Sequence, residues 1–394
     1  MFEKMSAMPP DAILTLIGEH RNDPREFKID LGVGVYRDAN GQTPIFSAVK
    51  KAERHLVDTQ PTKAYLGSGG NPEFNAAIQA LTFGDASLAD ERITTLQTPG
   101  GSGSLRVAAG LALRAKPGVP VWASDPTWAN HSPLLGGAGL ELKSYPYYDT
   151  RNKNIRFDAM LETLEKVPAG EIVLLHGCCH NPTGMDLTRD QWRAVVGLVA
   201  ERELLPYIDI AYQGFADGLE EDAFGVRLMY QRVPEMIVSS SCSKNFGLYR
   251  DRVGCLSVVG RDATASAILR SQALNIVRTL YSMPPDHGGV VVSHVLNDER
   301  LRDEWLVELD GMRRRLKEVR TLLAGALRDK TPGHDFSHIE RANGMFCFLG
   351  ISPDQVDRIK SEFAVYMVNS SRINVAGITK DNVEHLASSI AAVL

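Results

Sequence analysis

Residues 239–247 read S-S-S-C-S-K-N-F-G, and Arg252 follows five residues after this stretch. Lys244 therefore lies in a run of hydroxyl groups, with a permanent cation eight residues further along the chain. Hydroxyls and a guanidinium can hold a dianionic phosphate, and a nearby cationic site can lower the pKa of a lysine enough for Schiff-base formation near neutral pH. The stretch suits a covalently held aldehyde that carries a phosphate, such as pyridoxal phosphate. A solvated loop is the structural alternative.

The bulk composition is that of an ordinary globular protein. The chain has 394 residues, enough for two or three domains, with 44% hydrophobic and 23% charged residues. A net charge of −5 with mixed signs excludes a broad basic surface for nucleic acid. The five cysteines show no C-x-x-C pairing and indicate reduced thiols. Without a signal peptide or a long apolar run, we expect a cytoplasmic protein that contacts no membrane.

Short apolar runs alternate with longer amphipathic stretches over most of the chain. This alternation is typical of a mainly parallel sheet flanked by helices, an α/β fold. Ligands of such folds bind at the carboxyl ends of the strands, and several of the apolar runs end in polar clusters. The predicted strands are residues 119–122, 141–145, 172–176, 205–210, 236–239 and 254–259.

A second, smaller α+β domain is predicted after a long helix. Apolar residues recur at helical spacing over residues 301–327, which predicts one helix of roughly 40 Å. Residues 344–349 and 371–377 then have the composition of strands. We expect the short, proline-interrupted N-terminal segment to pack on the small domain. The predicted divisions are an N-terminal segment 1–35, a large cofactor-binding domain 36–310 and a small domain 311–394.

A glycine-rich turn precedes an apolar helix at residues 98–109, T-P-G-G-S-G-S-L-R-V-A-A. Consecutive N–H groups at a helix start form an anion site, helped by the positive end of the helix dipole. Neither a P-loop nor a dinucleotide-binding glycine motif is present in this stretch. An anion site and a plain turn both remain possible from this feature alone.

Asp209 lies at the end of the predicted strand 205–210 and Tyr212 follows it, so the two can meet two edges of one pyridine ring. A carboxylate keeps the ring nitrogen protonated, and a phenol can hydrogen-bond the 3-oxygen of the ring. Asn181 offers a second neutral donor to that oxygen. A helix cap is the other common role of an aspartate at a strand end.

The stretch H-G-C-C-H-N-P-T-G, residues 176–184, also contains zinc-ligand residue types. Zinc sites use ligand pairs two to four residues apart with a second pair elsewhere. Here we expect the adjacent cysteines to point apart, and no partner pair exists in the sequence. The sequence therefore predicts no metal site.

Taken together, these motifs resemble those of the class I pyridoxal-phosphate aminotransferases of the aspartate and aromatic amino-acid group. The stretches H-G-C-C-H-N-P-T-G, D-x-A-Y-Q-G-F and S-x-S-K-N-F-G-L-Y occur in the family's order, and the match runs from residue 31 to the segment around Arg372. The resemblance implies a fold-type I transferase with a mainly parallel seven-stranded sheet flanked by helices. It also implies pyridoxal 5'-phosphate as cofactor and a homodimer with shared active sites.

The same resemblance implies roles around the cofactor ring. Lys244 is similar to the Schiff-base lysine that later shuttles the proton, and Asp209 to the partner of the pyridine nitrogen. Tyr212 and Asn181 resemble the pair that bonds the 3-oxygen, and Trp128 the ring that stacks on the cofactor. A further match is His131, which would steady the aspartate. The implied phosphate ligands are Gly101, Ser102, Ser241, Ser243, Arg252 and, from the neighbouring subunit, Tyr65.

Two arginines are implied to bind substrate. Arg372 is similar to the arginine that binds the α-carboxylate, and Arg278 to the one that reaches across the dimer to a side-chain carboxylate. Gly34, Trp128 and Asn181 would also lie against the substrate. A lone arginine is ordinarily a surface cation, but the order of the motifs favours binding roles here.

The predicted activity is ping-pong transamination between an L-amino acid and a 2-oxo acid such as 2-oxoglutarate. Arg278 favours dicarboxylates, whereas Met283, Ala64 and Ser102 replace the Asn, Asn and Thr common in aspartate-selective relatives. We therefore predict an aromatic-amino-acid transaminase that retains activity on acidic substrates, with an aspartate aminotransferase as the alternative. A pyridoxal-phosphate lyase and a non-catalytic regulator of the same fold are more distant alternatives. The preferred donor and the pathway are not determined by the sequence.

Overall fold

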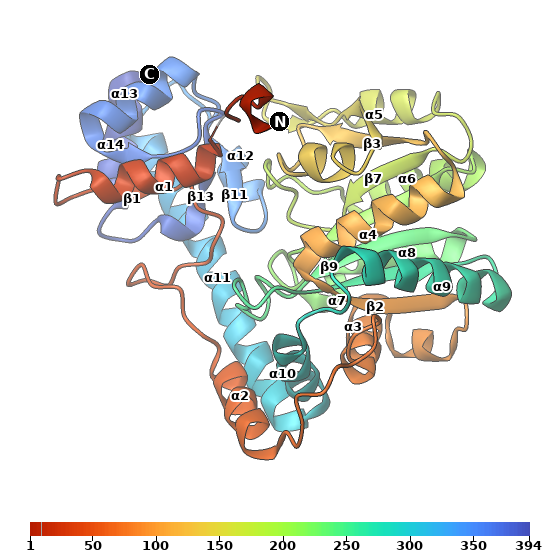
Figure 1. Ribbon diagram of the computed structural model, residues 1–394. Helices are drawn as coiled ribbons and strands as arrows, with labels where there is room; N and C mark the ends of the chain where they lie inside the picture. The colour runs from red at the N-terminus through yellow and green to blue at the C-terminus, as the bar shows by residue number, and fades with distance from the viewer. Residues whose placement is uncertain (9) are drawn as a thin grey trace.

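The computed structural model describes residues 1–8 and 10–394 and is built on one seven-stranded sheet (Figure 1). All strands are parallel except β10, which pairs antiparallel with both of its neighbours. The mainly parallel seven-stranded sheet predicted above is therefore confirmed. Its strands, in spatial order, are β2 (Ile93–Pro99), β10 (Val253–Val259), β9 (Met236–Ser241), β8 (Leu205–Ile210), β7 (Ile172–His176), β3 (Pro120–Asp125) and β4 (Glu141–Pro146).

The sequence pattern predicted six of these strands and missed β2. Four of its seven residues are polar, so it lacks the apolar run that marked the others. The polar side chains are nevertheless buried and bonded inside the protein. Thr95 Oγ1, for example, lies 2.9 Å from Gln79 Oε1 and 3.0 Å from Ser257 Oγ on β10.

Helices cover both faces of this sheet. The α-helices are α1 (Ala12–Asn22), α2 (Ser47–Thr59), α3 (Pro72–Phe83), α4 (Gly100–Ala115), α5 (Phe157–Leu164), α6 (Arg189–Glu201), α7 (Leu219–Asp222), α8 (Phe224–Arg232), α9 (Ala263–Leu280), α10 (Asp286–Asn297), α11 (Glu299–Lys330), α12 (His338–Arg341), α13 (Pro353–Phe363) and α14 (Val383–Val393). Helices α4 and α9 pack on one face, and α5, α6 and α8 on the other (Figure 1). None of the helices in the described residues is long and apolar enough to cross a membrane.

The packing of strand β7 shows why its sequence is apolar from Ile172 to Leu175. Ile172 and Leu174 join the cluster under α4 and α9, whereas Val173 and Leu175 join the cluster on the opposite face. Successive side chains of a strand point to opposite faces, so a strand covered on both sides needs apolar residues at every position. The continuous apolar run predicted a buried parallel strand for this reason.

A smaller unit lies at the far end of α11, the predicted long helix, which is confirmed at 32 residues (Figure 1). There β11 (Phe346–Phe348) pairs antiparallel with β13 (Arg372–Asn374). The N-terminal β1 (Ile29–Asp30) pairs parallel with β12 (Val365–Tyr366). These pairings bring residues near both ends of the chain together, whereas the exact domain limits stay a prediction.

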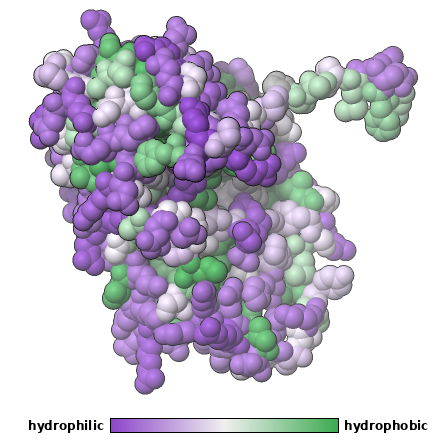
Figure 2. Space-filling model, turned by 90° about the vertical axis from the view of Figure 1, so that its left-hand side faces the viewer, coloured by the Kyte–Doolittle hydropathy of each residue, from purple (hydrophilic) through white to green (hydrophobic). Residues whose placement is uncertain are grey.

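Short elements complete the chain. They are the 3₁₀ turns η1 (Phe2–Lys4), η2 (Asp85–Ala89) and η4 (Val375–Gly377), the π-helical turn η3 (Ser132–Gly136), and the paired strands β5 (Tyr148–Asp149) and β6 (Asn154–Ile155). Residues 1–8 extend from the body of the molecule, and Figure 2 shows this segment standing away from it.

Candidate functional site

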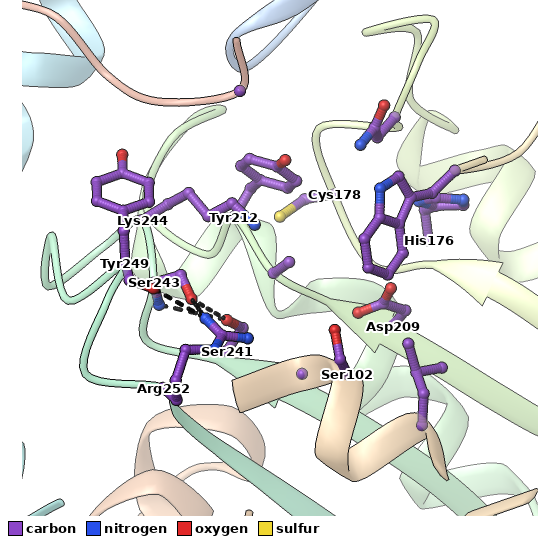
Figure 3. Close-up of a pocket in the computed structure, with 16 residues that line it drawn as sticks. Ser102, His176, Cys178, Asp209, Tyr212, Ser241, Ser243, Lys244, Tyr249 and Arg252 are labelled. Atoms are coloured by element: carbon purple, nitrogen blue, oxygen red, sulfur yellow. Dashed lines mark hydrogen bonds between the residues drawn. The ribbon is translucent and has the colours of Figure 1, made fainter. Parts of the chain in front are cut away.

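A cavity of about 230 Å³ lies at the edge of the sheet where β7, β8 and β9 end and α4 begins. The carboxyl ends of parallel strands share one edge of a sheet, so motifs far apart in sequence meet there. Most of the residues predicted to bind cofactor or substrate line this cavity (Figure 3). They are Gly34, Gly101, Ser102, Trp128, Asn181, Asp209, Tyr212, Ser241, Ser243, Lys244 and Arg252.

One end of the cavity is built to bind an anion. The Oγ atoms of Ser241 and Ser243 lie 3.0 Å apart, and Arg252 Nη1 lies 3.4 Å from Ser243 Oγ (Figure 3). The first turn of α4 adds N–H groups that have no partner within the helix, at the positive end of its dipole. At Gly100, with φ of 69°, a Cβ would lie 2.4 Å from Arg252 Nη2. Glycine at this position therefore allows the guanidinium to approach the helix start.

Asp209 lies at the other end of the cavity, and the His131 side chain is hydrogen-bonded to its carboxylate. Asp209 Oδ2 is 3.1 Å from Nε2 of His131, which is completely buried. Burial raises the pKa of the Asp209 carboxyl, but the hydrogen bond from His131 and nearby positive charges outweigh it and hold the pKa below its usual value. A permanent carboxylate is thus held inside the protein.

Lys244 lines the same cavity beside Tyr212, and its Nζ lies 4.6 Å from the centre of the Tyr212 ring (Figure 3). Burial lowers the pKa of its amine to about 8, the carboxylate of Asp209 opposes this shift, and Arg252 adds to it. The sequence predicted a lowered pKa from the cationic neighbour, whereas desolvation is the larger cause in the structure. A large fraction of the amine is therefore neutral and nucleophilic slightly above neutral pH.

Tyr212 and Asn181 present neutral polar groups to the same cavity. Burial raises the pKa of the Tyr212 phenol well above its usual value, so the hydroxyl keeps its proton. Asn181 Oδ1 is buried and has no hydrogen-bond partner among the described residues. Unpaired buried oxygens are costly, and this one faces a space that a ligand can fill.

Arg372 lies beside the cavity rather than in its lining. Its side chain is 7% exposed, Nη2 donates to the carbonyl of Gly32 at 2.7 Å, and Nε has no partner in the described structure. The guanidinium carbon lies 4.4 Å from the centre of the Phe346 ring. The remaining donors are thus available to an anion next to Gly34.

Two predicted site residues are not brought to the cavity by this chain. Tyr65 is 93% exposed, and Arg278 is exposed at the end of α9, where it donates to the hydroxyl of Ser282. Neither residue lines the cavity. Within one chain, neither side chain is placed to contact a ligand bound at Lys244.

Several lining residues had no role in the sequence prediction. These are Leu105, His176, Cys178, Ala211 and Tyr249. His176, Cys178, Ala211 and Tyr249 lie inside the quoted motifs, so the available signal was proximity to a predicted ligand. The phenol of Tyr249 accepts from the backbone N–H of Tyr36 at 2.9 Å, which links the segment after Lys244 to the chain just after the N-terminal segment.

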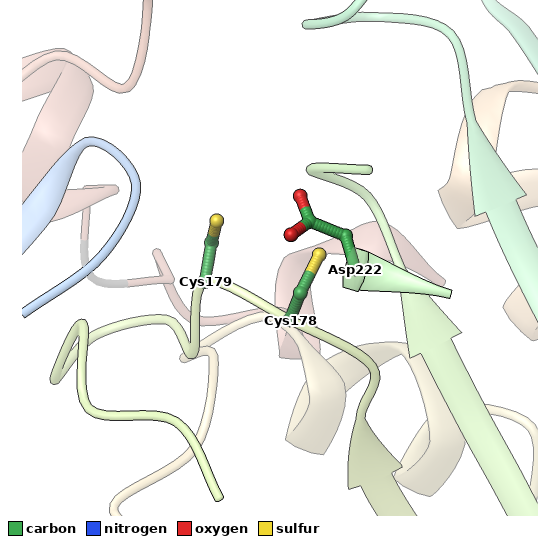
Figure 4. Close-up of side chains that lie close together, drawn as sticks. All are labelled: Cys178, Cys179 and Asp222. Atoms are coloured by element: carbon green, nitrogen blue, oxygen red, sulfur yellow. The ribbon is translucent and has the colours of Figure 1, made fainter. Parts of the chain in front are cut away.

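Cys178, Cys179 and Asp222 form a buried group whose ligand atoms lie within 4.8 Å of one another (Figure 4). The expectation that the adjacent cysteines point apart is wrong, because Cys179 adopts a left-handed backbone, with φ of 50°. The Asp222 carboxylate already accepts four backbone N–H groups between residues 214 and 218. Burial raises the pKa of the Cys179 thiol to about 12, which keeps it neutral. We attribute the group to the packing of two loops.

Comparison with known proteins identifies the family. The model of the family described as aminotransferase class I and II matches residues 26–390. The chain belongs to this family. An aromatic-amino-acid aminotransferase of Pseudomonas aeruginosa is 49% identical over 100% of this chain and 98% of that protein. An aspartate aminotransferase of Escherichia coli is 47% identical over the full length of both chains.

A solved structure shows the same fold for an aminotransferase with its cofactor. The aromatic-amino-acid aminotransferase of Burkholderia pseudomallei, covalently bound to pyridoxal phosphate, superposes with a TM-score of 0.97. It is 41% identical, and the match covers 100% of this chain and 99% of that one. The predicted family and the predicted fold-type I architecture are therefore confirmed for this aminotransferase.

Proposed function

We propose that this aminotransferase uses pyridoxal phosphate to exchange an amino group between aromatic or acidic L-amino acids and a 2-oxo acid such as 2-oxoglutarate. The observation that carries the proposal is that one cavity is lined by an anion site, a buried carboxylate and a lysine. The relatives named above, which act on aromatic amino acids and on aspartate, support it.

The residues present fit this cofactor. The hydroxyls of Ser241 and Ser243, the Arg252 guanidinium and the start of α4 would hold its phosphate. Asp209, ionised and backed by His131, would hold the protonated ring nitrogen. The unpaired Oδ1 in the Asn181 side chain marks a polar group that faces the same space; the Asn181 amide would rotate to donate to the ring oxygen.

When bound, pyridoxal phosphate supplies an aldehyde that accepts the amino group and a pyridinium ring that withdraws electrons from the substrate α-carbon. The chain supplies the proton transfers. Lys244 Nζ, as a neutral amine, would take the proton from the α-carbon and return it to the cofactor carbon. Asp209, held as a carboxylate, would keep the ring nitrogen protonated, and the protonated Tyr212 phenol would donate to the ring oxygen.

Substrate choice would depend on two arginines. Arg372, buried and with a free Nε, would bind the α-carboxylate common to all amino acids. Arg278 would bind the distal carboxylate of acidic substrates. Met283 and Ala64 leave the surroundings of Arg278 without the amides of aspartate-selective relatives, so this arginine can move aside for an aromatic ring. We therefore favour aromatic substrates, with aspartate aminotransferase as the second candidate because Arg278 is retained.

We further propose that the active form is a homodimer. Tyr65 and Arg278 are exposed and lie outside the cavity of their own chain, so both would serve the site of a second copy. Apolar side chains are also exposed near the N-terminus, where Phe2 is 73% and Met8 is 84% exposed. Burial of such side chains in an interface would favour association. The cytoplasmic location stays a prediction.

An absorbance spectrum of the purified protein tests the proposal. We expect a band from the lysine-bound cofactor that changes with pH and converts to the pyridoxamine form when glutamate is added. Turnover of phenylalanine and aspartate with 2-oxoglutarate then ranks the substrates. Aromatic turnover a thousandfold below that of aspartate would establish the aspartate alternative, and pyruvate release without an amino acceptor would indicate a lyase. Absence of any cofactor band contradicts the proposal.

A further inference from the structure

Arg320, in the middle of α11, is a buried cation outside the cavity. Its side chain is 1% exposed, and it forms no ion pair with any carboxylate in the ranges 1–8 and 10–394. Its guanidinium instead donates to four backbone carbonyls, those of Ile339 at 3.1 Å, Asn343 at 3.0 Å, Gly344 at 2.8 Å and Phe346 at 2.9 Å. Burying a charge without an opposite charge beside it costs free energy, and these four hydrogen bonds offset that cost.

Ile339 lies in α12, and the other three acceptors lie in the connection that runs from α12 into β11. A fork of fixed geometry that binds several carbonyls determines the path of the backbone between them. The connection 343–346, which we call the Arg320 loop, contains little regular structure of its own before β11 begins. The conformation of the Arg320 loop therefore depends on the guanidinium.

The Arg320 loop packs directly on the chain segment that carries Asn181. The N–H of Asn343 donates to the carbonyl of Gly184 at 2.6 Å, and Asn343 Nδ2 donates to Asp186 at 3.1 Å. At Gly184, with φ of 69°, a Cβ would lie 2.1 Å from the carbonyl oxygen of Phe346. At Gly184 the two backbones are thus in direct contact, and the Asn343–Asp186 side-chain bond adds to this contact.

Phe346 connects the Arg320 loop to the substrate side of the cavity. The Arg372 guanidinium lies over the Phe346 ring at 4.4 Å, and the Tyr212 ring meets it edge-on at 6.2 Å. A Cβ on Gly34 would lie 3.1 Å from the tip of the same ring. The ring therefore supports one face of Arg372 and limits the space beside Gly34.

We propose that Arg320 is a positioning residue for the carboxylate-binding site of this enzyme. It acts by fixing the carbonyls of the Arg320 loop, which places the Phe346 ring under the Arg372 guanidinium. The inference rests on the proposed role of Arg372 in binding the α-carboxylate. It adds that the affinity of the site for a carboxylate is set from a helix that contacts neither substrate nor cofactor.

The test compares Arg320→Met and Arg320→Lys with Arg314→Lys, a matched control on an exposed part of the same helix. The probes are 3-phenylpropanoate and its neutral analogue 3-phenylpropan-1-ol, each titrated into the cofactor-loaded enzyme by calorimetry. We expect Arg320→Met to weaken the carboxylate about tenfold and the alcohol by less than about twofold. Arg320→Lys should fall between wild type and Arg320→Met, and Arg314→Lys should bind both probes as the wild type does.

A merely structural role predicts a different result. Equal weakening of both probes, or no change in either, overturns the proposal. In an Arg372→Lys background, Arg320→Met should add little further loss for the carboxylate, because the two residues act through one contact; additive losses contradict this. Should Arg320→Met fail to fold, Phe346→Leu must give the same selective loss. Retained binding of 3-phenylpropanoate by Arg372→Lys itself would instead disprove the assigned role of Arg372.

Discussion

The two halves of the predicted active site differ in how far one chain can build them. The half that would hold the cofactor is built almost entirely by one chain, because Asp209 and Ser241 lie at the ends of the neighbouring strands β8 and β9, Lys244 follows β9, and all three line one cavity. Of the implied phosphate ligands, Tyr65 is the exception, because it is exposed and outside this cavity. The half that would select the substrate is not complete within one chain. Arg278, the implied partner of the distal carboxylate, is exposed and outside that cavity.

The difference indicates that the groups behind one activity are held in place by two different physical effects. Groups at the carboxyl edge of a parallel sheet are positioned by the sheet itself, whose backbone bonds and buried faces leave little freedom. Groups at the end of a surface helix are positioned only when another surface covers them. Cofactor chemistry should therefore depend on residues of one chain, and discrimination between acidic and aromatic substrates on two.

The largest effect is expected from a substitution in the half that would hold the cofactor. Lys244→Ala should reduce transamination by about 10⁴-fold or more, because no other amine lines the cavity to transfer the proton. Stopped-flow absorbance with saturating amino acid measures the loss. Cofactor retention, followed by phosphate analysis after gel filtration, is the control, since Ser241, Ser243 and Arg252 hold that end independently. Near-normal turnover would show that the lysine assignment is wrong.

A substitution in the half that would select the substrate should give a smaller effect that depends on the substrate. Arg278→Ala should lower kcat/KM for aspartate roughly 30–150-fold, a loss of ~2–3 kcal/mol in transition-state stabilisation. The reason is that it removes a charged hydrogen-bonding partner of the distal carboxylate. Phenylalanine lacks that carboxylate and should be turned over as fast as before or faster. Steady-state kinetics on both substrates provides the matched pair. Equal losses for aspartate and phenylalanine would assign Arg278 a structural role.

A pH series tests whether residues of its own chain set the pKa of Lys244. Burial lowers the pKa of Lys244 to about 8, so the neutral fraction of the amine rises about tenfold between pH 7 and pH 9. The rate at which apoprotein captures pyridoxal phosphate should rise with it and level off above the pKa. Because the positive charge of Arg252 contributes to the lowering, Arg252→Ala should move the midpoint to higher pH. An unchanged or lower midpoint contradicts the assigned electrostatics.

The sharing of sites between chains gives the smallest numerical effect and the most direct test. Lys244→Ala and Arg278→Ala subunits, mixed in equal amounts, should form hybrids in about half of the dimers, each with one intact site. Activity on aspartate should recover to about one quarter of the wild-type value, while either variant alone stays low. Mass spectrometry of the intact dimers verifies subunit exchange. Verified hybrids without recovered activity would exclude a shared site.

Much of the fold could be read from the sequence because its signals are local. Residues 172–175 are apolar at every position, and residues 301–327 repeat at helical spacing, so each predicted its element. Strand β2 was missed because four of its seven residues are polar and find their partners on other elements. Thr95, for example, contacts Gln79 on helix α3 and Ser257 on strand β10. The orientation of Cys178 and Cys179 was predicted wrongly because it depends on one left-handed residue.

The sequence by itself determined the identity of the chemical groups: one lysine among hydroxyls, an aspartate and a tyrosine after a strand, and arginines late in the chain. These follow from residue types and short spacings, which do not depend on the rest of the fold. Only the tertiary structure decided which of them meet, that burial is the main cause of the lowered Lys244 pKa, and that Arg320 holds the loop under Arg372. Distance, desolvation and the path of a loop arise from packing between segments far apart in sequence, and no local pattern encodes them.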